Sequence, residues 1–184
     1  MQHVAVVGNS CVDFINLRAP LLKKIQNCNS RVSVIGPECS DEKVLVEMEK
    51  LNFNYVSYPI KPVSLNPLSD LKTFYKIYKI LKDINPNKVL LLTLKPIVYG
   101  SIASKLNGIS NVYSLNSGLG RIFVRQSLYQ KFVLIFLQPM LKAAFRFNKK
   151  VFFQNPDDQR LFKSLKLCSQ DQSIVVNGTG IDIN

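Results

Sequence analysis

Apolar and polar residues alternate along this chain with two different periods. Short runs rich in β-branched residues, typical of buried strands, are separated by longer stretches in which apolar residues recur every three or four positions, typical of helices. The short runs predict seven strands, at Val4–Gly8, Arg31–Gly36, Phe53–Tyr58, Val89–Leu94, Val112–Leu115, Lys150–Gln154 and Ser173–Val176. The longer stretches predict six helices, at Ile15–Gln26, Ser40–Leu51, Leu68–Ile84, Pro96–Lys105, Ser127–Phe147 and Pro156–Leu165.

Strands that alternate with helices indicate a parallel sheet covered on both faces. We therefore expect residues 1–184 to form one α/β domain, a doubly wound, Rossmann-like fold with a mainly parallel sheet of about seven strands. In such sheets the ligand binds beyond the carboxyl ends of the strands. The residues that directly follow each strand are therefore the first candidates for a binding site.

The helix predicted at Leu68–Ile84 has the clearest pattern. Leu71, Phe74, Tyr78 and Leu81 form one apolar stripe, which we expect to face the sheet. The other faces carry a row of lysines that we expect to be solvated: Lys72, Lys76, Lys79 and Lys82. In the last helix, Asn155 is expected to be the N-cap, because Pro156 follows it at the first helical position.

Composition excludes a disordered chain, and the net charge indicates which partners the protein favours. An apolar fraction of 47% and a mean hydropathy of +0.08 exclude a largely disordered chain. Twenty-four Lys and Arg residues against twelve Asp and Glu give a net charge of +12, which favours phosphates, nucleic acid or an anionic membrane surface. The excess is concentrated in one region, because no acidic residue occurs between Asp83 and Asp157.

Three further classes of feature are expected to be absent. The longest apolar run without a charge, Phe132–Leu141, has ten residues, whereas a membrane-spanning helix needs about 20. The N-terminus has no basic leader and predicts a strand instead of a signal peptide. The four cysteines lack C-x-x-C and zinc-ligand spacing, and the chain has one histidine, His3. We therefore expect reduced thiols and no metal site.

Two loops have residues suited to binding phosphate. Gly8-Asn9-Ser10 follows the first strand, but it matches neither the dinucleotide fingerprint nor the P-loop. Ser117-Gly118-Leu119-Gly120-Arg121 combines two glycines, which let backbone amides approach an anion, with a neighbouring cation. Each loop is equally compatible with an ordinary tight turn ahead of a helix.

The segment Leu128–Phe147 carries more apolar residues than docking on a sheet requires, and its only charged residues are basic. One interpretation is a helix that lies on an anionic bilayer surface. The residues predicted to contact lipid are Arg125, Lys131, Phe132, Phe136, Lys142 and Arg146. The alternative is a helix buried in the core, with its basic residues on a small solvated face.

Five short motifs, taken together, resemble those of one enzyme family. Leu94-Lys95-Pro96-Ile97-Val98-Tyr99-Gly100-Ser101 is similar to the T-x-K-P-x-x-Y-G stretch of bacterial retaining glycosyltransferases with the GT-B fold. Phe14, Arg18 and Pro20 resemble the F-R-x-P-L-L pattern of their first helix. The other three matches are Ser117-Gly118-Leu119-Gly120, Phe153-Gln154-Asn155-Pro156-Asp157-Asp158 and Gly178-Thr179-Gly180-Ile181-Asp182, in the family's order along almost the whole chain.

The resemblance implies a two-domain enzyme that transfers a sugar from a nucleotide-sugar, expected to be UDP-linked, to a polyprenyl-diphosphate-linked saccharide, with retention. Residues 1–184 would be the N-terminal, acceptor-side domain of such a hexosyltransferase in surface polysaccharide or glycan synthesis. The donor-binding C-terminal domain, with its paired glutamates, is absent from these residues or supplied by a partner chain. The isolated domain is therefore expected to be inactive, and no metal or other cofactor is expected.

The resemblance also implies roles for particular residues. Contacts to the donor or to phosphate are expected from Asn9, Ser10, Gly118, Leu119, Gly120, Arg121, Gly178 and Gly180. Contacts to the acceptor are expected from Arg18, Lys95 and Asn155. The implied location is the cytoplasmic face of the inner membrane, to which the protein would bind peripherally.

Two other classes of function stay open at the level of sequence. One is another Rossmann-like nucleotide-binding enzyme, such as an epimerase or dehydrogenase, although a complete glycine fingerprint is missing. The other is a basic nucleic-acid-binding module, although the chain has no recognised binding motif and no obvious platform of exposed aromatic residues. We expect no nucleic-acid partner.

Overall fold

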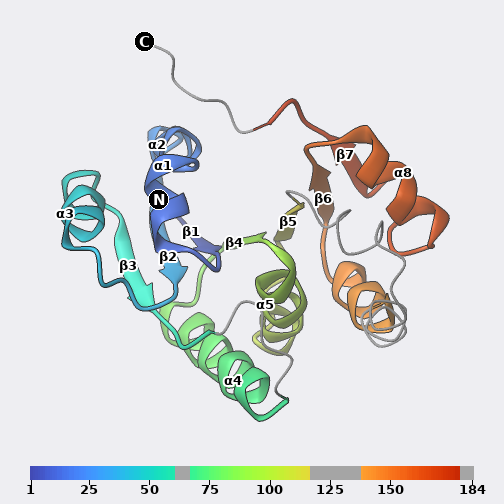
Figure 1. The fold of residues 1–184 in the computed structure, drawn as a ribbon, viewed down its shortest axis with the longest axis horizontal. Helices are drawn as coiled ribbons and strands as arrows, with labels where there is room; N and C mark the ends of the chain where they lie inside the picture. Colours follow the sequence, from blue (N-terminus) through green and yellow to red (C-terminus); the bar gives the residue numbers. More distant parts are fainter. Residues whose placement is uncertain (61–66, 117–137, 179–184) are drawn as a thin grey trace.

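A computed structural model describes residues 1–60, 67–116 and 138–178 (Figure 1). The seven predicted strands are present, and all of them pair in parallel. Their order in the sheet is β3-β2-β1-β4-β5-β6-β7. The strands are β1 (Gln2–Val7), β2 (Ser30–Gly36), β3 (Asn54–Ser57), β4 (Lys88–Leu92), β5 (Val112–Asn116), β6 (Lys150–Phe153) and β7 (Ser173–Val175). The expected α/β, Rossmann-like fold is therefore confirmed.

The helices follow the strands along the chain, and one predicted helix is divided in two. The described helices are α1 (Cys11–Asn16), α2 (Ala19–Asn27), α3 (Glu42–Lys50), α4 (Pro67–Ile84), α5 (Leu94–Leu106) and α8 (Pro156–Ser164), together with a helical segment at 138–146. The single helix predicted at Ile15–Gln26 is wrong. Proline has no N–H, so Pro20 cannot extend α1; it instead occupies the first turn of α2.

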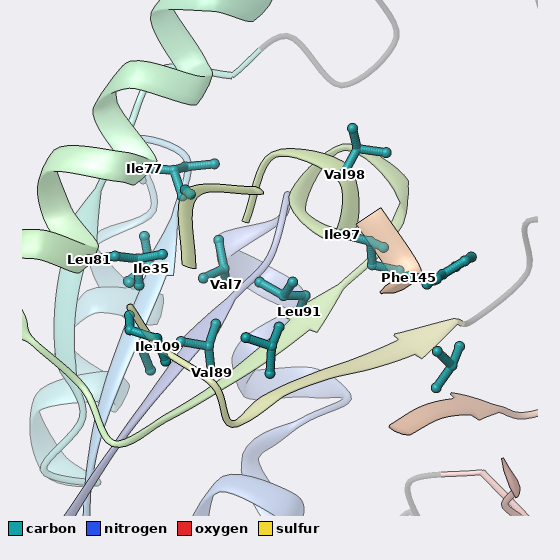
Figure 2. Packing of buried hydrophobic residues seen from close by; sticks show 14 of the residues in the cluster. Val7, Ile35, Ile77, Leu81, Val89, Leu91, Ile97, Val98, Ile109 and Phe145 are labelled. Carbon is teal, nitrogen blue, oxygen red and sulfur yellow. The ribbon is translucent and has the colours of Figure 1, made fainter. Parts of the chain in front are cut away.

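Two clusters of buried apolar side chains lie on opposite faces of the sheet. Side chains from α4, α5, α8 and segment 138–146 pack on one face, around Ala5 and Val7 of β1. Figure 2 shows part of this cluster, with Ile77 and Leu81 of α4 beside Ile35. Side chains from α1, α2 and α3 pack on the other face, where Val4 and Val6 of β1 point. This division is the doubly wound arrangement, because successive strand residues point to opposite faces.

The apolar stripe predicted on α4 is partly wrong. Leu71 is 62% exposed, whereas the buried positions are Thr73, Ile77, Ile80 and Leu81. Phe74 and Tyr78 of the predicted stripe do pack against the core, although each is only partly buried. The helix carries apolar residues along two of its faces, and only one of these faces can lie against the sheet.

A buried polar cluster ties segment 138–146 to the sheet. The Asn148 amide nitrogen donates hydrogen bonds to Ser101 Oγ at 2.7 Å and to the Ala144 carbonyl at 2.8 Å. Its amide oxygen accepts one from Ser114 Oγ at 2.5 Å. Leu141, Ala144 and Phe145 of the segment are buried. The described end of the predicted membrane helix is thus a core element on one side.

Candidate functional site

In doubly wound sheets a binding crevice is expected where the strand order reverses, which here is between β1 and β4. From β1 the chain proceeds through β2 to β3 on one side, and it then returns to β4 on the other side of β1 (Figure 1). Ligands of doubly wound proteins bind at such a reversal, outside the carboxyl ends of the strands. The chain segments at this position are Gly8–Ser10, after β1, and Thr93–Lys95, after β4.

The loop after β1 is held by contacts from three other elements. The Gly8 N–H donates to the Ile35 carbonyl at 2.9 Å, and the buried Tyr58 hydroxyl donates to the Gly8 carbonyl at 2.7 Å. Ser10 is the N-cap of α1, and its Oγ accepts from the Asp13 N–H at 3.3 Å. The loop therefore has a fixed path. The predicted phosphate contacts of Asn9 and Ser10 stay predictions.

The ring of Phe14 explains two glycines at this edge of the sheet. A Cβ atom on Gly8 would lie 2.7 Å from the ring, and one on Gly36 would lie 2.9 Å from it. The Tyr55 hydroxyl, which would be 2.8 Å from that second Cβ, fills the space on the other side. Any larger residue at the ends of β1 and β2 would displace Phe14, which is itself 1% exposed.

Thr93 has an unusual backbone conformation at the carboxyl end of β4. Its φ of 67° and ψ of 165° are rarely adopted by residues other than glycine. The Thr93 hydroxyl donates to the Leu92 carbonyl at 2.5 Å, and α5 begins at the next residue. Strain of this kind occurs often at binding sites, where the surrounding structure maintains it. Thr93 is therefore a candidate site residue; it stands at the first position of the T-x-K-P pattern, but the sequence analysis gave it no role.

Lys95 is paired with an acidic residue from another helix. Its Nζ lies 2.7 Å from Oδ1 of Asp70, and the two side chains are only 12% and 20% exposed. The Tyr99 hydroxyl also lies near Asp70, and burial, with a smaller contribution from Asp70, raises the pKa of Tyr99. The motif residues Lys95 and Tyr99, one helical turn apart on α5, therefore hold the first turn of α4. The predicted acceptor contact of Lys95 stays a prediction. An anion that binds Lys95 would have to compete with the Asp70 carboxylate for its ammonium group.

Arg18 is buried between α1 and α2, with an exposed fraction of 7%. Burial lowers the pKa of its guanidinium, and the nearby Asp13 carboxylate partly opposes this shift. Asn155 is the N-cap of α8, as predicted, and its Oδ1 accepts from the Asp157 N–H at 2.8 Å. The acceptor roles of Arg18 and Asn155 stay predictions.

The remaining predicted site residues are only partly described. Gly178 has φ of 76°, a left-handed conformation that suits glycine. Lys142 and Arg146 are exposed on segment 138–146. Outside the described residues lie Gly118, Leu119, Gly120, Arg121, Gly180, Arg125, Lys131, Phe132 and Phe136.

Neither a metal-binding cluster nor a membrane-spanning helix is found in the described part of the chain. Within residues 1–60, 67–116 and 138–178, no three His, Cys, Asp or Glu side chains lie close enough together to hold a metal ion. In the same part of the chain, no helix is both long enough and apolar enough to cross a bilayer. The single histidine, His3, lies in β1, and its Nε2 is 2.8 Å from Ser33 Oγ, which fits a structural role.

The sheet and the reversal of its strand order define a Rossmann-like α/β domain. The chain belongs to the glycosyl transferase 4-like family, whose model matches residues 3–155. The resemblance seen in the motifs is thereby confirmed.

Individual relatives are similar over almost the whole chain. One is an N,N'-diacetylbacillosaminyl-diphospho-undecaprenol α-1,3-N-acetylgalactosaminyltransferase of Campylobacter jejuni, 23% identical over 99% of this chain and 47% of its own length. MurG of Acinetobacter baumannii aligns with a TM-score of 0.62 and 15% identity, over all of this chain and 47% of MurG. A UDP-GlcNAc 2-epimerase of Neisseria meningitidis aligns with a TM-score of 0.65 and 17% identity, over 96% of this chain and 47% of its own.

The chain spans about half the length of the relatives it matches. The structural likenesses show the fold alone, because transferases and epimerases share it. The family match and the transferase from Campylobacter favour the transferase class over the epimerase alternative.

Proposed function

We propose that residues 1–184 are the N-terminal, acceptor-side half of a retaining glycosyltransferase, which transfers a hexosyl group from a nucleotide-sugar to a polyprenyl-diphosphate-linked saccharide. The observation that carries the proposal is the similarity, over 99% of this chain, to a transferase whose named acceptor is a diphospho-undecaprenol saccharide. The net charge of +12 suits two substrates that both carry diphosphates.

The crevice between β1 and β4 would form one wall of the active site. A second domain, on a longer chain or a partner, would supply the other wall and most of the contacts to the donor. Cations and backbone amides fixed near the departing nucleoside diphosphate would stabilise the charge that develops on it. Arg121 and the Gly118–Gly120 loop are proposed for this role, with a UDP-linked donor and no requirement for metal.

The proposal includes peripheral binding to the cytoplasmic face of the inner membrane. Besides the predicted segment Leu128–Phe147, one face of α4 supports this. Leu68, Leu71 and Tyr75 are 75%, 62% and 62% exposed, and their spacing of three and four residues places them along one stripe. Exposed lysines flank the stripe, at Lys72, Lys76 and Lys79. An apolar stripe bordered by cations suits the surface of an anionic bilayer.

The transferase proposal is tested with the chain alone and with the chain joined to the sequence that follows it in its gene. Each is incubated with UDP-sugars and a synthetic undecaprenyl-diphosphate saccharide, and the lipid product is identified by mass spectrometry and by the NMR coupling of its anomeric proton. We expect transfer with retention only from the longer protein. Conversion of UDP-GlcNAc to its 2-epimer without any acceptor would instead support the epimerase alternative.

The membrane proposal is tested by co-sedimentation with vesicles, with and without phosphatidylglycerol. Binding should require the anionic lipid and weaken toward molar salt, where the Debye length falls to about 3 Å. A variant with Leu71 and Tyr75 changed to Ser tests α4, and one with Lys142 and Arg146 changed to Gln tests segment 138–146. Equal binding to neutral and anionic vesicles would contradict the proposal.

A further inference from the structure

Two of the four cysteines occupy matching positions beyond neighbouring strands. In the register of the sheet, Val7 of β1 lies opposite Ile35 of β2. Cys11 follows Val7 by four residues, and Cys39 follows Ile35 by four residues. Because both strands point the same way, both cysteines lie beyond the same edge of the sheet, which is also the edge of the β1–β4 crevice.

The side chains of these cysteines lie close together. The Cys39 thiol lies close enough to Cys11 to contribute to the raised pKa of Cys11, and the Cys39 Sγ donates to the Asp41 carbonyl at 3.8 Å. Both thiols are free and half-buried, and both pack beside Tyr55 against the apolar cluster on this face of the sheet. Because both thiols are partly exposed, small reagents can reach them. Packing against the apolar cluster keeps the two cysteines near each other.

We propose that Cys11 and Cys39 form a site of reversible oxidation, at which a hydroperoxide converts the two thiols to a disulfide. One of the two sulfurs attacks the O–O bond of the peroxide, which releases water and leaves a sulfenic acid on that cysteine. The other sulfur then attacks the sulfenic acid sulfur and displaces a second water. Overall, two thiols lose two electrons and two protons, and one hydrogen peroxide becomes two waters.

Either sulfur can be oxidised first, because both thiols are partly exposed and neighbour each other. Burial, together with the neighbouring Cys39, raises the pKa of Cys11 to about 11, which slows any attack by Cys11 at neutral pH. A small-molecule dithiol would reduce the bond again by exchange.

The disulfide would join the first residue of α1 to the loop between β2 and α3. It would close a loop from residue 11 to residue 39 and so restrict the unfolded chain, which raises stability. It would also restrain the segment Gly8–Ser10, which directly precedes Cys11. The inference rests on the proximity of Cys11 and Cys39 and holds whether or not the protein transfers a sugar.

Trypsin offers a direct test on the chain, because it places each cysteine on a separate peptide. Cleavage after Lys and Arg puts Cys11 on residues 1–18, Cys28 on residues 25–31, Cys39 on residues 32–43 and Cys168 on residues 167–184. The native chain is treated with hydrogen peroxide, its remaining thiols are alkylated, and the digest is analysed by mass spectrometry without reduction. The expected product is the 1–18 peptide linked to the 32–43 peptide, lighter by two hydrogen atoms than their sum.

Three variants complete the test. Cys28→Ser, which removes an exposed thiol, should leave the linked peptide and the oxidation-dependent rise in melting temperature unchanged. Cys11→Ser and Cys39→Ser should abolish both, and in Cys11→Ser a sulfenic-acid probe should label Cys39. Separate alkylation of Cys11 and Cys39 after oxidation, or a main product linked through Cys28 or Cys168, would overturn the proposal.

Discussion

Replacing Asn148 with Leu should destabilise the domain strongly, although the two side chains are similar in size. Asn148 is 5% exposed, and its amide makes three hydrogen bonds, two of them to the hydroxyls of Ser101 and Ser114. Leucine would leave both hydroxyls and the Ala144 carbonyl without this partner. A buried polar group left unsatisfied costs about 1–3 kcal/mol. Since Ser101 can turn toward a carbonyl of its own helix, we expect a loss of about 3–5 kcal/mol.

Urea denaturation, followed by far-UV circular dichroism, measures this loss against a total stability of about 5–15 kcal/mol for a typical domain. The triple variant with Ser101→Ala, Ser114→Ala and Asn148→Leu is the decisive comparison. It removes both ends of two hydrogen bonds, so it should recover a large part of the stability. Ser104→Ala is the control, because the Ser104 hydroxyl is buried without a hydrogen-bond partner within the described residues, and its loss should be neutral or stabilising. A triple variant no more stable than Asn148→Leu would refute the reasoning.

Three other changes test separate parts of the fold. Lys95→Met should lower the free energy of unfolding by about 2–3 kcal/mol, because it leaves the Asp70 carboxylate without its cation. A double-mutant cycle with Asp70→Asn, measured in urea, should show coupling between the two residues. Additive effects would argue against a stabilising ion pair. Gly100→Ala should cost about 1–3 kcal/mol, since its Cβ would lie 2.4 Å from Leu91 Cδ2, and an unchanged melting temperature would contradict that packing. Burial, with Arg31 nearby, lowers the folded-state pKa of His3 below 6.5, so the unfolded state binds more protons and stability falls as the pH drops through about 6.5. The His3→Gln variant should lose less stability between pH 7 and pH 5, and identical losses would count against this assignment.

The sheet could be predicted from the sequence because its central strands are buried on both faces. In the predicted strand Val89–Leu94 every residue except Thr93 is apolar, and that pattern does not depend on distant residues. The boundary between α1 and α2 needed more than the apolar pattern, which runs through both helices. Pro20 carried the missing signal, since a proline two residues into a helix usually marks a start.

The candidate site was less predictable, because its contacts join residues that are distant in sequence. Motif similarity singled out Lys95, but its partner Asp70 lies 25 residues earlier, on the first turn of α4. Nothing in a single sequence pairs them. The buried face of α4 was ambiguous for a related reason, since Leu71 and Ile77 are equally apolar and only tertiary packing decides between their two stripes.

The central place of β1 in the sheet has a consequence for the order of folding. Its pairing with β2 joins residues 28 positions apart, such as Gln2 and Ser30, whereas its pairing with β4 joins residues 84 positions apart, such as Val4 and Lys88. For flexible chains, closing the longer loop costs about 1 kcal/mol more in entropy than closing the shorter one. We therefore expect β1 and β2 to associate first, with β4 added later to the exposed edge of β1. Until β4 arrives, that edge can pair with other chains, so this stage is the one most exposed to aggregation.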